Sequence, residues 1–143
     1  APNWIDYNGH MTEAAYLEAF GWGTDKLFRF IGVDESYREN GNSFYTVESH
    51  INYYQEVGVG EPFKVTTQLL GLDGKRMHIF HYMYHGRTGD LLATTEQMLL
   101  HVDMKAQSAC PTLPNVQKAL QAIMDTHKSM DQPKQVGHQM LIK

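Results

Sequence analysis

One long apolar helix followed directly by four strand-like segments is the pattern that most restricts the fold of this chain. Apolar side chains, among them Leu17, recur at steps of three and four from residue 11 to residue 31, which predicts a helix with one apolar face. Thr12 is placed to cap the start of that helix, and Gly32 is placed to end it. Glycine weakens a helix, so a glycine inside one usually has a packing reason. We expect Gly21 and Gly23, which have no side chain, to let a neighbouring strand pack closely.

Segments of alternating apolar and polar residues follow this helix, at residues 44–55, 63–72, 76–85 and 91–102. In the first of them, alternation predicts that Tyr45 and Ile51 share one face and that Glu48 lies on the other. Asp73 and Gly74 predict a tight hairpin turn after the second segment. We expect a further helix over about residues 115–129. Consecutive strands beside segregated helices indicate an α+β fold, with an antiparallel sheet wrapped around the long first helix.

Composition sets limits on the class of protein. The 143 residues suit a single domain spanning residues 1–143, and the net charge of −4 comes without the basic stripe of a nucleic-acid-binding protein. No apolar run is long enough to span a membrane, and no signal peptide is recognisable. Cys110 is the only cysteine, which excludes an intrachain disulfide, fits a cytoplasmic protein and favours a structural role. Because the chain begins at Ala1 rather than Met, a first strand could lie upstream.

The turn before the first helix concentrates groups that are capable of catalysis. Asp6, Asn8 and His10 lie within five residues. A carboxylate can act as general base or nucleophile, and an imidazole can orient a group or carry a proton. The free N–H groups at a helix start can polarise a carbonyl oxygen. These are the parts needed to attack an acyl carbonyl, although a simple capping turn, with Gly9 permitting the bend, would use the same residue types.

Several motifs resemble the hotdog-fold thioesterases of the 4-hydroxybenzoyl-CoA type. They are the Asp6-x-x-Gly9 turn, the helix segment 16–20, the strand 47–53, and the Gly60-Glu61-Pro62-Phe63 start of the next strand. The resemblance covers about residues 4–102. It implies a hotdog fold, whose first strand would precede the turn, and hydrolysis of an acyl-CoA thioester. Coenzyme A would be part of the substrate, with no further cofactor and no metal, and the protein would be a homodimer or a dimer of dimers that pairs residues 44–55 across a two-fold axis.

The resemblance also implies roles for individual residues. Asp6 matches the catalytic carboxylate, and the polarising N–H groups fall near Met11 to Glu13. The Asp6-x-Asn8-x-His10 spacing is similar to the catalytic trio of plant acyl-carrier-protein thioesterases, and Glu48 is a candidate supporting acid. The expected catalytic residues are therefore Asp6, Asn8, His10 and Glu48.

Residues 4–13 read Trp-Ile-Asp-Tyr-Asn-Gly-His-Met-Thr-Glu, a string similar to the betainyl-CoA thioesterases of carnitine degradation, some of which are fused to carnitine dehydrogenase. The chain lacks a glycine-rich dinucleotide fingerprint, so it corresponds to the thioesterase part alone. A betainyl group carries a quaternary ammonium, which exposed aromatic faces can hold. The expected substrate-binding residues are Trp4, Tyr7, Met11, Thr12, Glu13, Tyr16, Trp22 and Tyr53. Packing in the core is the alternative role for these rings.

Other interpretations remain open at this point. His81 and His85 share a strand face about 13 Å apart and His78 points the other way, so these three cannot bind one metal ion. The protein could instead hold an acyl-CoA without catalysis, hydrolyse a neutral short-chain or aromatic acyl-CoA, or be a hotdog dehydratase.

Overall fold

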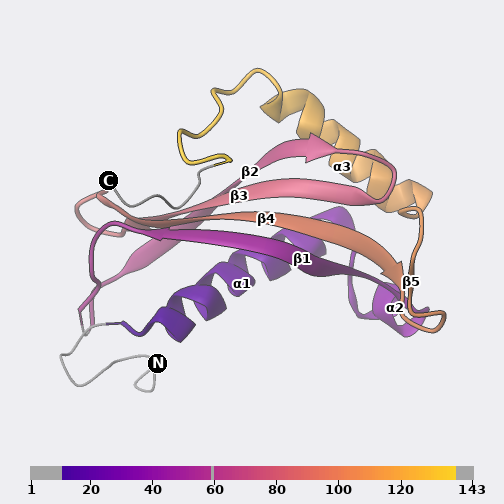
Figure 1. Ribbon diagram of the computed structural model, residues 1–143, viewed down its shortest axis with the longest axis horizontal. Coiled ribbons are helices and arrows are strands. Elements are labelled where there is room, and N and C mark those ends of the chain that lie inside the picture. The colour runs from indigo at the N-terminus through magenta and orange to yellow at the C-terminus, as the bar shows by residue number, and fades with distance from the viewer. Residues whose placement is uncertain (1–10, 59, 138–143) are drawn as a thin grey trace.

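The long helix α1 (Glu13–Ile31) lies against one face of an antiparallel sheet, as Figure 1 shows. The computed structural model describes residues 11–58 and 60–137. The sheet contains β1 (Asn42–Tyr53), β2 (Phe63–Leu72), β3 (Arg76–His85), β4 (Leu91–Asp103) and β5 (Ser108–Ala109). The other helices in these ranges are α2 (Glu35–Glu39) and α3 (Pro114–His127). The long strands lie in the order β1-β4-β3-β2, and β5 pairs with β4, so the predicted α+β fold is confirmed.

The ends of α1 form as the sequence predicts. Thr12 Oγ1 accepts a hydrogen bond from the Ala15 N–H at 3.2 Å, which satisfies one of the free donors of the first turn. At the other end Gly32 has φ 94°, and its N–H donates to Phe28 O. A left-handed conformation of this kind suits glycine, because glycine has no Cβ to clash.

The buried face of α1 differs in part from the predicted one. Phe20 is fully buried, but Leu17 is 50% exposed, so the prediction is wrong for Leu17. A Cβ on Gly23 would stand 2.9 Å from Val65 Cγ1, which confirms the predicted close approach of a strand. Nothing lies within 4 Å of the corresponding point on Gly21, so that prediction is wrong. The face of α1 that packs against the sheet is therefore the one that carries Gly23.

A bulge in β1 reverses the predicted alternation. The register against β4 shifts between Thr46 and Glu48. Tyr45 is paired with Leu100 and Glu48 with Met98, so these two side chains lie on the same face of the sheet, contrary to the prediction. An extra residue in one strand moves every later side chain to the other face.

The remaining strands agree closely with the sequence. β2 and β3 have the predicted bounds, and β4 extends one residue further. Asp73 Oδ1 accepts the N–H groups of Lys75 and Arg76 at 2.8 and 2.7 Å, which confirms the hairpin turn. The short α2 and β5 were not predicted. No helix in the described part of the chain is both long enough and apolar enough to cross a bilayer.

Helix α3 covers the free edge of β2. Val116 and Leu120 are buried, and the Leu69 N–H donates to His127 Nδ1 at 2.9 Å. The helix thus satisfies a backbone donor that an edge strand would otherwise leave open.

A buried histidine connects α1 to the sheet. His81 Nε2 lies 2.9 Å from Thr24 Oγ1, and His81 Nδ1 lies 2.7 Å from Thr67 Oγ1. The Thr24 hydroxyl also lies 3.3 Å from Phe20 O and 3.5 Å from Gln97 Oε1. One nitrogen of a neutral imidazole donates and the other accepts, so both ring nitrogens of His81 have a hydroxyl partner. Burial lowers the pKa of His81 from 6.5 to about 4.

This pKa makes stability depend on pH. Above pH 6.5 the ring is neutral in both the folded and the unfolded state, whereas between pH 6.5 and about 4 only the unfolded state binds the proton. As the pH is lowered through this range, we expect the free energy of unfolding to fall by about 1.4 kcal/mol per pH unit. Urea unfolding of the wild type and of His81→Asn at pH 7 and pH 5 measures the effect. Equal pH dependence of the two proteins would contradict it.

Candidate functional site

The centre of the predicted catalytic turn lies outside the residues that the structure describes. Trp4, Asp6, Tyr7, Asn8 and His10 all precede Met11, where the description begins. Their roles stay predictions. The structure does describe the start of α1 and the elements that hold it.

The backbone at the start of α1 is partly occupied. The Met11 N–H donates to Val57 O at 2.9 Å, and the Met11 side chain is buried in the core. This N–H is therefore not open to a substrate carbonyl, contrary to the expected role of Met11. The Thr12 hydroxyl is used in capping Ala15. Among the described residues, no acceptor takes the N–H of Thr12 or Ala14, and N–H groups of a first helical turn are suited to binding a carbonyl oxygen.

Two of the predicted substrate-binding rings meet beside this helix start. The Tyr16 and Tyr53 rings lie edge to face, with centroids 5.1 Å apart. Tyr16 is buried and donates from Oη to Gln55 O at 3.2 Å, whereas Tyr53 is 45% exposed. Burial raises the pKa of Tyr16, so its phenol stays neutral and remains a donor.

Other predicted site residues are not brought to this point. Trp22 is 53% exposed and lies six residues beyond Tyr16, which turns it about 120° away around the helix. Glu48 is exposed and opposite Met98, on the face of the sheet that α1 does not cover. Within one chain Glu48 therefore does not face the start of α1. The side chain of Glu13 lies outside the described residues.

Glu61 is a contributor to which the sequence assigned no role. Its Oε2 accepts the Gly58 N–H at 2.6 Å, and its Oε1 lies 3.6 Å from His85 Nε2. Gly58 follows Val57, whose carbonyl receives the Met11 N–H. The only signal in the sequence was the Gly60-Glu61-Pro62-Phe63 string, which indicated the start of a strand but no contact with the helix.

A second group of polar side chains lies on the opposite face of the sheet. His78 Nε2 is 2.6 Å from Glu96 Oε2, and Glu96 Oε1 accepts the Gly137 N–H at 3.0 Å. Because His81 bonds toward α1, the predicted opposite orientation of His78 and His81 is confirmed. Among the described residues, no group of three or more His, Cys, Asp or Glu is arranged to hold a metal ion.

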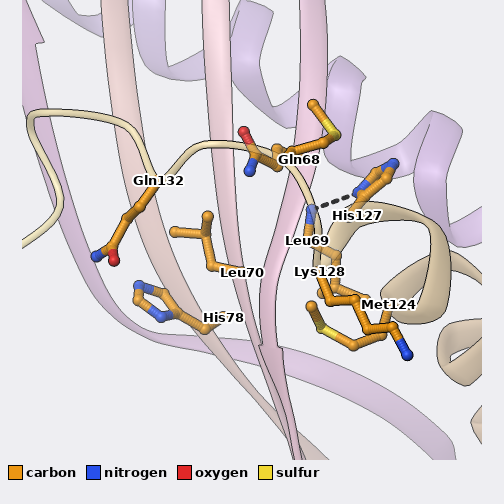
Figure 2. A pocket seen from close by; sticks show the side chains of 9 residues that line it. Gln68, Leu69, Leu70, His78, Met124, His127, Lys128 and Gln132 are labelled. Atoms are coloured by element: carbon orange, nitrogen blue, oxygen red, sulfur yellow. Dashed lines mark hydrogen bonds between the residues drawn. The ribbon is translucent and has the colours of Figure 1, made fainter.

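Figure 2 shows the small pocket beside His78, in which His78 and Gln132 lie on one side and Met124 and Lys128 on the other. Its volume is about 200 Å³. The lining residues are Gln68, Leu69, Leu70, His78, Met124, His127, Lys128, Met130 and Gln132. His127 contributes to the wall while its Nδ1 is engaged by Leu69, so the pocket depends on how α3 meets β2.

The single cysteine has a histidine neighbour that its local sequence did not indicate. Cys110 Sγ lies 3.3 Å from His101 Nδ1, and His101 Nε2 lies 2.6 Å from Tyr37 Oη. Burial raises the pKa of the Cys110 thiol and lowers that of His101. Both groups are therefore neutral near pH 7 rather than a thiolate and an imidazolium, which agrees with the expected structural role.

Comparison with known proteins identifies the family. The model of the thioesterase-like superfamily matches residues 1–120. The chain belongs to this superfamily. A hypothetical protein of Staphylococcus aureus, solved in complex with CoA, superposes with a TM-score of 0.91 over 99% of this chain and 89% of that one, at 22% identity. The fold is the predicted hotdog fold.

Two relatives of this thioesterase-like chain carry more specific names. The L-carnitine dehydrogenase/betainyl-CoA thioesterase of Rhizobium meliloti strain 1021 is 46% identical over 134 residues, which is 94% of this chain and 27% of the relative. The betainyl-CoA thioesterase of Pseudomonas aeruginosa is 42% identical over 137 residues, which is 95% of this chain and 86% of the relative. The chain thus spans about a quarter of the fused relative and most of the separate one.

Proposed function

We propose that this chain hydrolyses an acyl-CoA thioester, and that its substrate is betainyl-CoA, which yields betaine and free CoA. The observation that carries the proposal is the 42% identity to the separate betainyl-CoA thioesterase of Pseudomonas aeruginosa over 86% of that protein. The similarity therefore extends over nearly a whole enzyme rather than over one motif.

The proposed chemistry centres on Asp6. Its carboxylate either takes a proton from a water molecule that adds to the thioester carbonyl, or attacks that carbonyl itself to form a mixed anhydride that water then hydrolyses. In both cases the C–S bond breaks, CoA leaves as the thiol with a proton that comes from the water, and the free acid and the Asp6 carboxylate remain. N–H groups from Thr12 onward stabilise the negative charge that develops on the carbonyl oxygen. Asn8 and His10 orient the reacting groups. Glu48 lies on the face of the sheet that α1 does not cover, so it would contribute to the site of a second subunit rather than to its own.

Recognition of the betainyl group is proposed to rest on aromatic rings. Tyr16 and Tyr53 form a pair next to the helix start, and the Tyr53 ring is partly open to solvent. A quaternary ammonium has no N–H and makes no hydrogen bond as a donor, so an aromatic face is its best neutral partner. Trp4 and Tyr7 are further candidates by their position in the sequence.

The proposed reaction is a hydrolysis, so we propose that no resident cofactor takes part and that CoA enters only as part of the substrate. We also propose a cytoplasmic location, where acyl-CoA esters and a single unpaired cysteine are both compatible with the surroundings.

We further propose that two chains pair through β1 to form a dimer, which two dimers could extend to a tetramer. The two edges of the sheet support this. In the described part of the chain, β1 pairs only with β4, and its residues Tyr45 and Val47 are 51% and 56% exposed. The β2 edge, in contrast, is covered by α3. A long bare apolar edge tends to pair with another chain, and a two-fold axis closes that contact.

The first prediction concerns Asp6. Replacement by Asn removes the base while keeping a residue that suits a turn, so we expect kcat for betainyl-CoA to fall about 10²–10⁴-fold. Release of free thiol measures the rate, and circular dichroism checks the fold. Near-normal hydrolysis by a folded Asp6→Asn protein would remove Asp6 from the mechanism.

The second prediction concerns the cation. A desolvated cation–π contact contributes about 2 kcal/mol, or about 30-fold in rate. We expect kcat/KM to be higher for betainyl-CoA than for its neutral isostere 3,3-dimethylbutyryl-CoA, and Tyr53→Leu to reduce this preference. Equal or better turnover of the neutral ester would end the claim of cation recognition and leave a thioesterase for neutral acyl groups. Binding of both esters without hydrolysis would favour a non-catalytic protein.

The third prediction concerns assembly. Light scattering at micromolar protein should return two or four times the mass of one chain. Val47→Lys places a charge on the β1 edge and should shift the protein toward the monomer, whereas Leu113→Lys, at an exposed site before α3, serves as the control. A monomer mass for the wild type would refute pairing through β1.

A further inference from the structure

We propose that Glu61 is a positioning residue for thioester hydrolysis, because it fixes the loop carbonyl that holds the start of α1. The proposal rests on the proposed function for its kinetic consequence. Its structural part, the coupling between Glu61 and Met11, stands on the geometry of the described residues alone.

The first step of this coupling is the protonation state of His85. Its Nδ1 accepts the N–H groups of Arg87 and Thr88 at 3.1 and 3.3 Å, in the turn between β3 and β4. An acceptor nitrogen carries no proton, so the proton of the neutral ring is on Nε2. The Nε2–H therefore faces Glu61 Oε1 at 3.6 Å and favours the ionised carboxylate.

The second step leads from Glu61 to the helix. Glu61 Oε2 accepts the Gly58 N–H at 2.6 Å, a short bond of the charge-assisted kind. This bond, followed by His85, lowers the pKa of Glu61. With Gly58 held, the preceding Val57 carbonyl is directed at the Met11 N–H, 2.9 Å away. Val57 is itself buried, so its side chain stays in the core while Glu61 sets the direction of its carbonyl.

The segment is secured at two further places. Tyr16 Oη donates to Gln55 O at 3.2 Å, and the Gly86 N–H donates to Pro62 O at 2.8 Å. A Cβ on Gly86 would stand 2.9 Å from Pro62 Cβ, so the two turns touch. Glu61 lies between these contacts, and it connects the turn after β3 to the first residue ahead of the helix cap.

The orientation of the N–H groups at the start of α1 matters because negative charge develops on the thioester carbonyl oxygen during the reaction. Because Val57 occupies the Met11 N–H, the N–H groups that follow are presented to the carbonyl oxygen in one fixed orientation. Donors aimed at a transition state lose most of their effect when they are displaced by about 1 Å, which can reduce a rate about 100-fold. Because these donors act on charge that develops in the transition state, binding should change much less than the chemical step.

The test compares Glu61→Leu, which removes the acceptor for Gly58, with Glu61→Gln, which keeps one acceptor but turns an N–H₂ toward the His85 N–H. Glu39→Gln, at the exposed end of α2, is the control. For hydrolysis of betainyl-CoA we expect kcat to fall about 10- to 100-fold in Glu61→Leu and less in Glu61→Gln, with KM and the thermal midpoint little changed. Glu39→Gln should match the wild type.

Hydrogen exchange of the Met11 and Gly58 amides provides a readout that does not need activity. Both should exchange fastest in Glu61→Leu, more slowly in Glu61→Gln and most slowly in the wild type. A Glu61→Leu protein that keeps the wild-type kcat, or in which Met11 stays as protected as before, overturns the proposal. If that variant does not fold, unchanged kcat and exchange in Glu61→Gln overturn it.

Failure of the proposed function would look different. If the wild type released no thiol from any CoA ester tested, the thioesterase proposal would fall, while the exchange measurements would still decide whether Glu61 holds Met11.

Discussion

The close approach of α1 to the sheet is the contact on which the rest of this structure depends. At Gly23 the helix backbone comes so near β2 that a single added carbon would meet Val65 at 2.9 Å. The approach brings Phe20 fully into the core and places Thr24 within hydrogen-bonding distance of His81. A neutral histidine between two hydroxyls satisfies buried polar groups that would otherwise destabilise the fold. The position of the helix is therefore set by Gly23, which has no side chain, and by the hydrogen-bonded ring of His81.

That position determines the two ends of the molecule differently. At the start of α1, the loop after β1 reaches Met11 and Tyr16, and an exposed ring, open N–H groups and a charged carboxylate gather there. At the other end, the buried His101 contacts the half-buried Cys110 and Tyr37 in a neutral group. Burial without charge separation stabilises local structure, whereas backbone donors at a helix start can act on a substrate carbonyl. The difference in electrostatics supports chemistry at the first end.

Much of the fold could be predicted from the sequence, because its signals are local. The caps Thr12 and Gly32 and the turn at Asp73 act within a few residues, and the structure confirms all three. The errors arose where a neighbour in space decides. The bulge after Thr46 depends on pairing with β4, and the exposure of Leu17 depends on which face of α1 meets the sheet. Periodicity alone contains neither fact.

The sequence by itself determined the type and order of the long elements, the hairpin turn between β2 and β3, and the family resemblance centred on Asp6. The tertiary structure alone decided that the Met11 N–H at the helix start is occupied, because its acceptor comes from Val57, far along the chain. It also decided the role of Glu61, whose partners Gly58 and His85 meet only when two turns pack together. Helix caps and turns are encoded by residues a few positions apart, whereas the occupancy of a hydrogen-bond donor is set by whichever segment folding brings beside it.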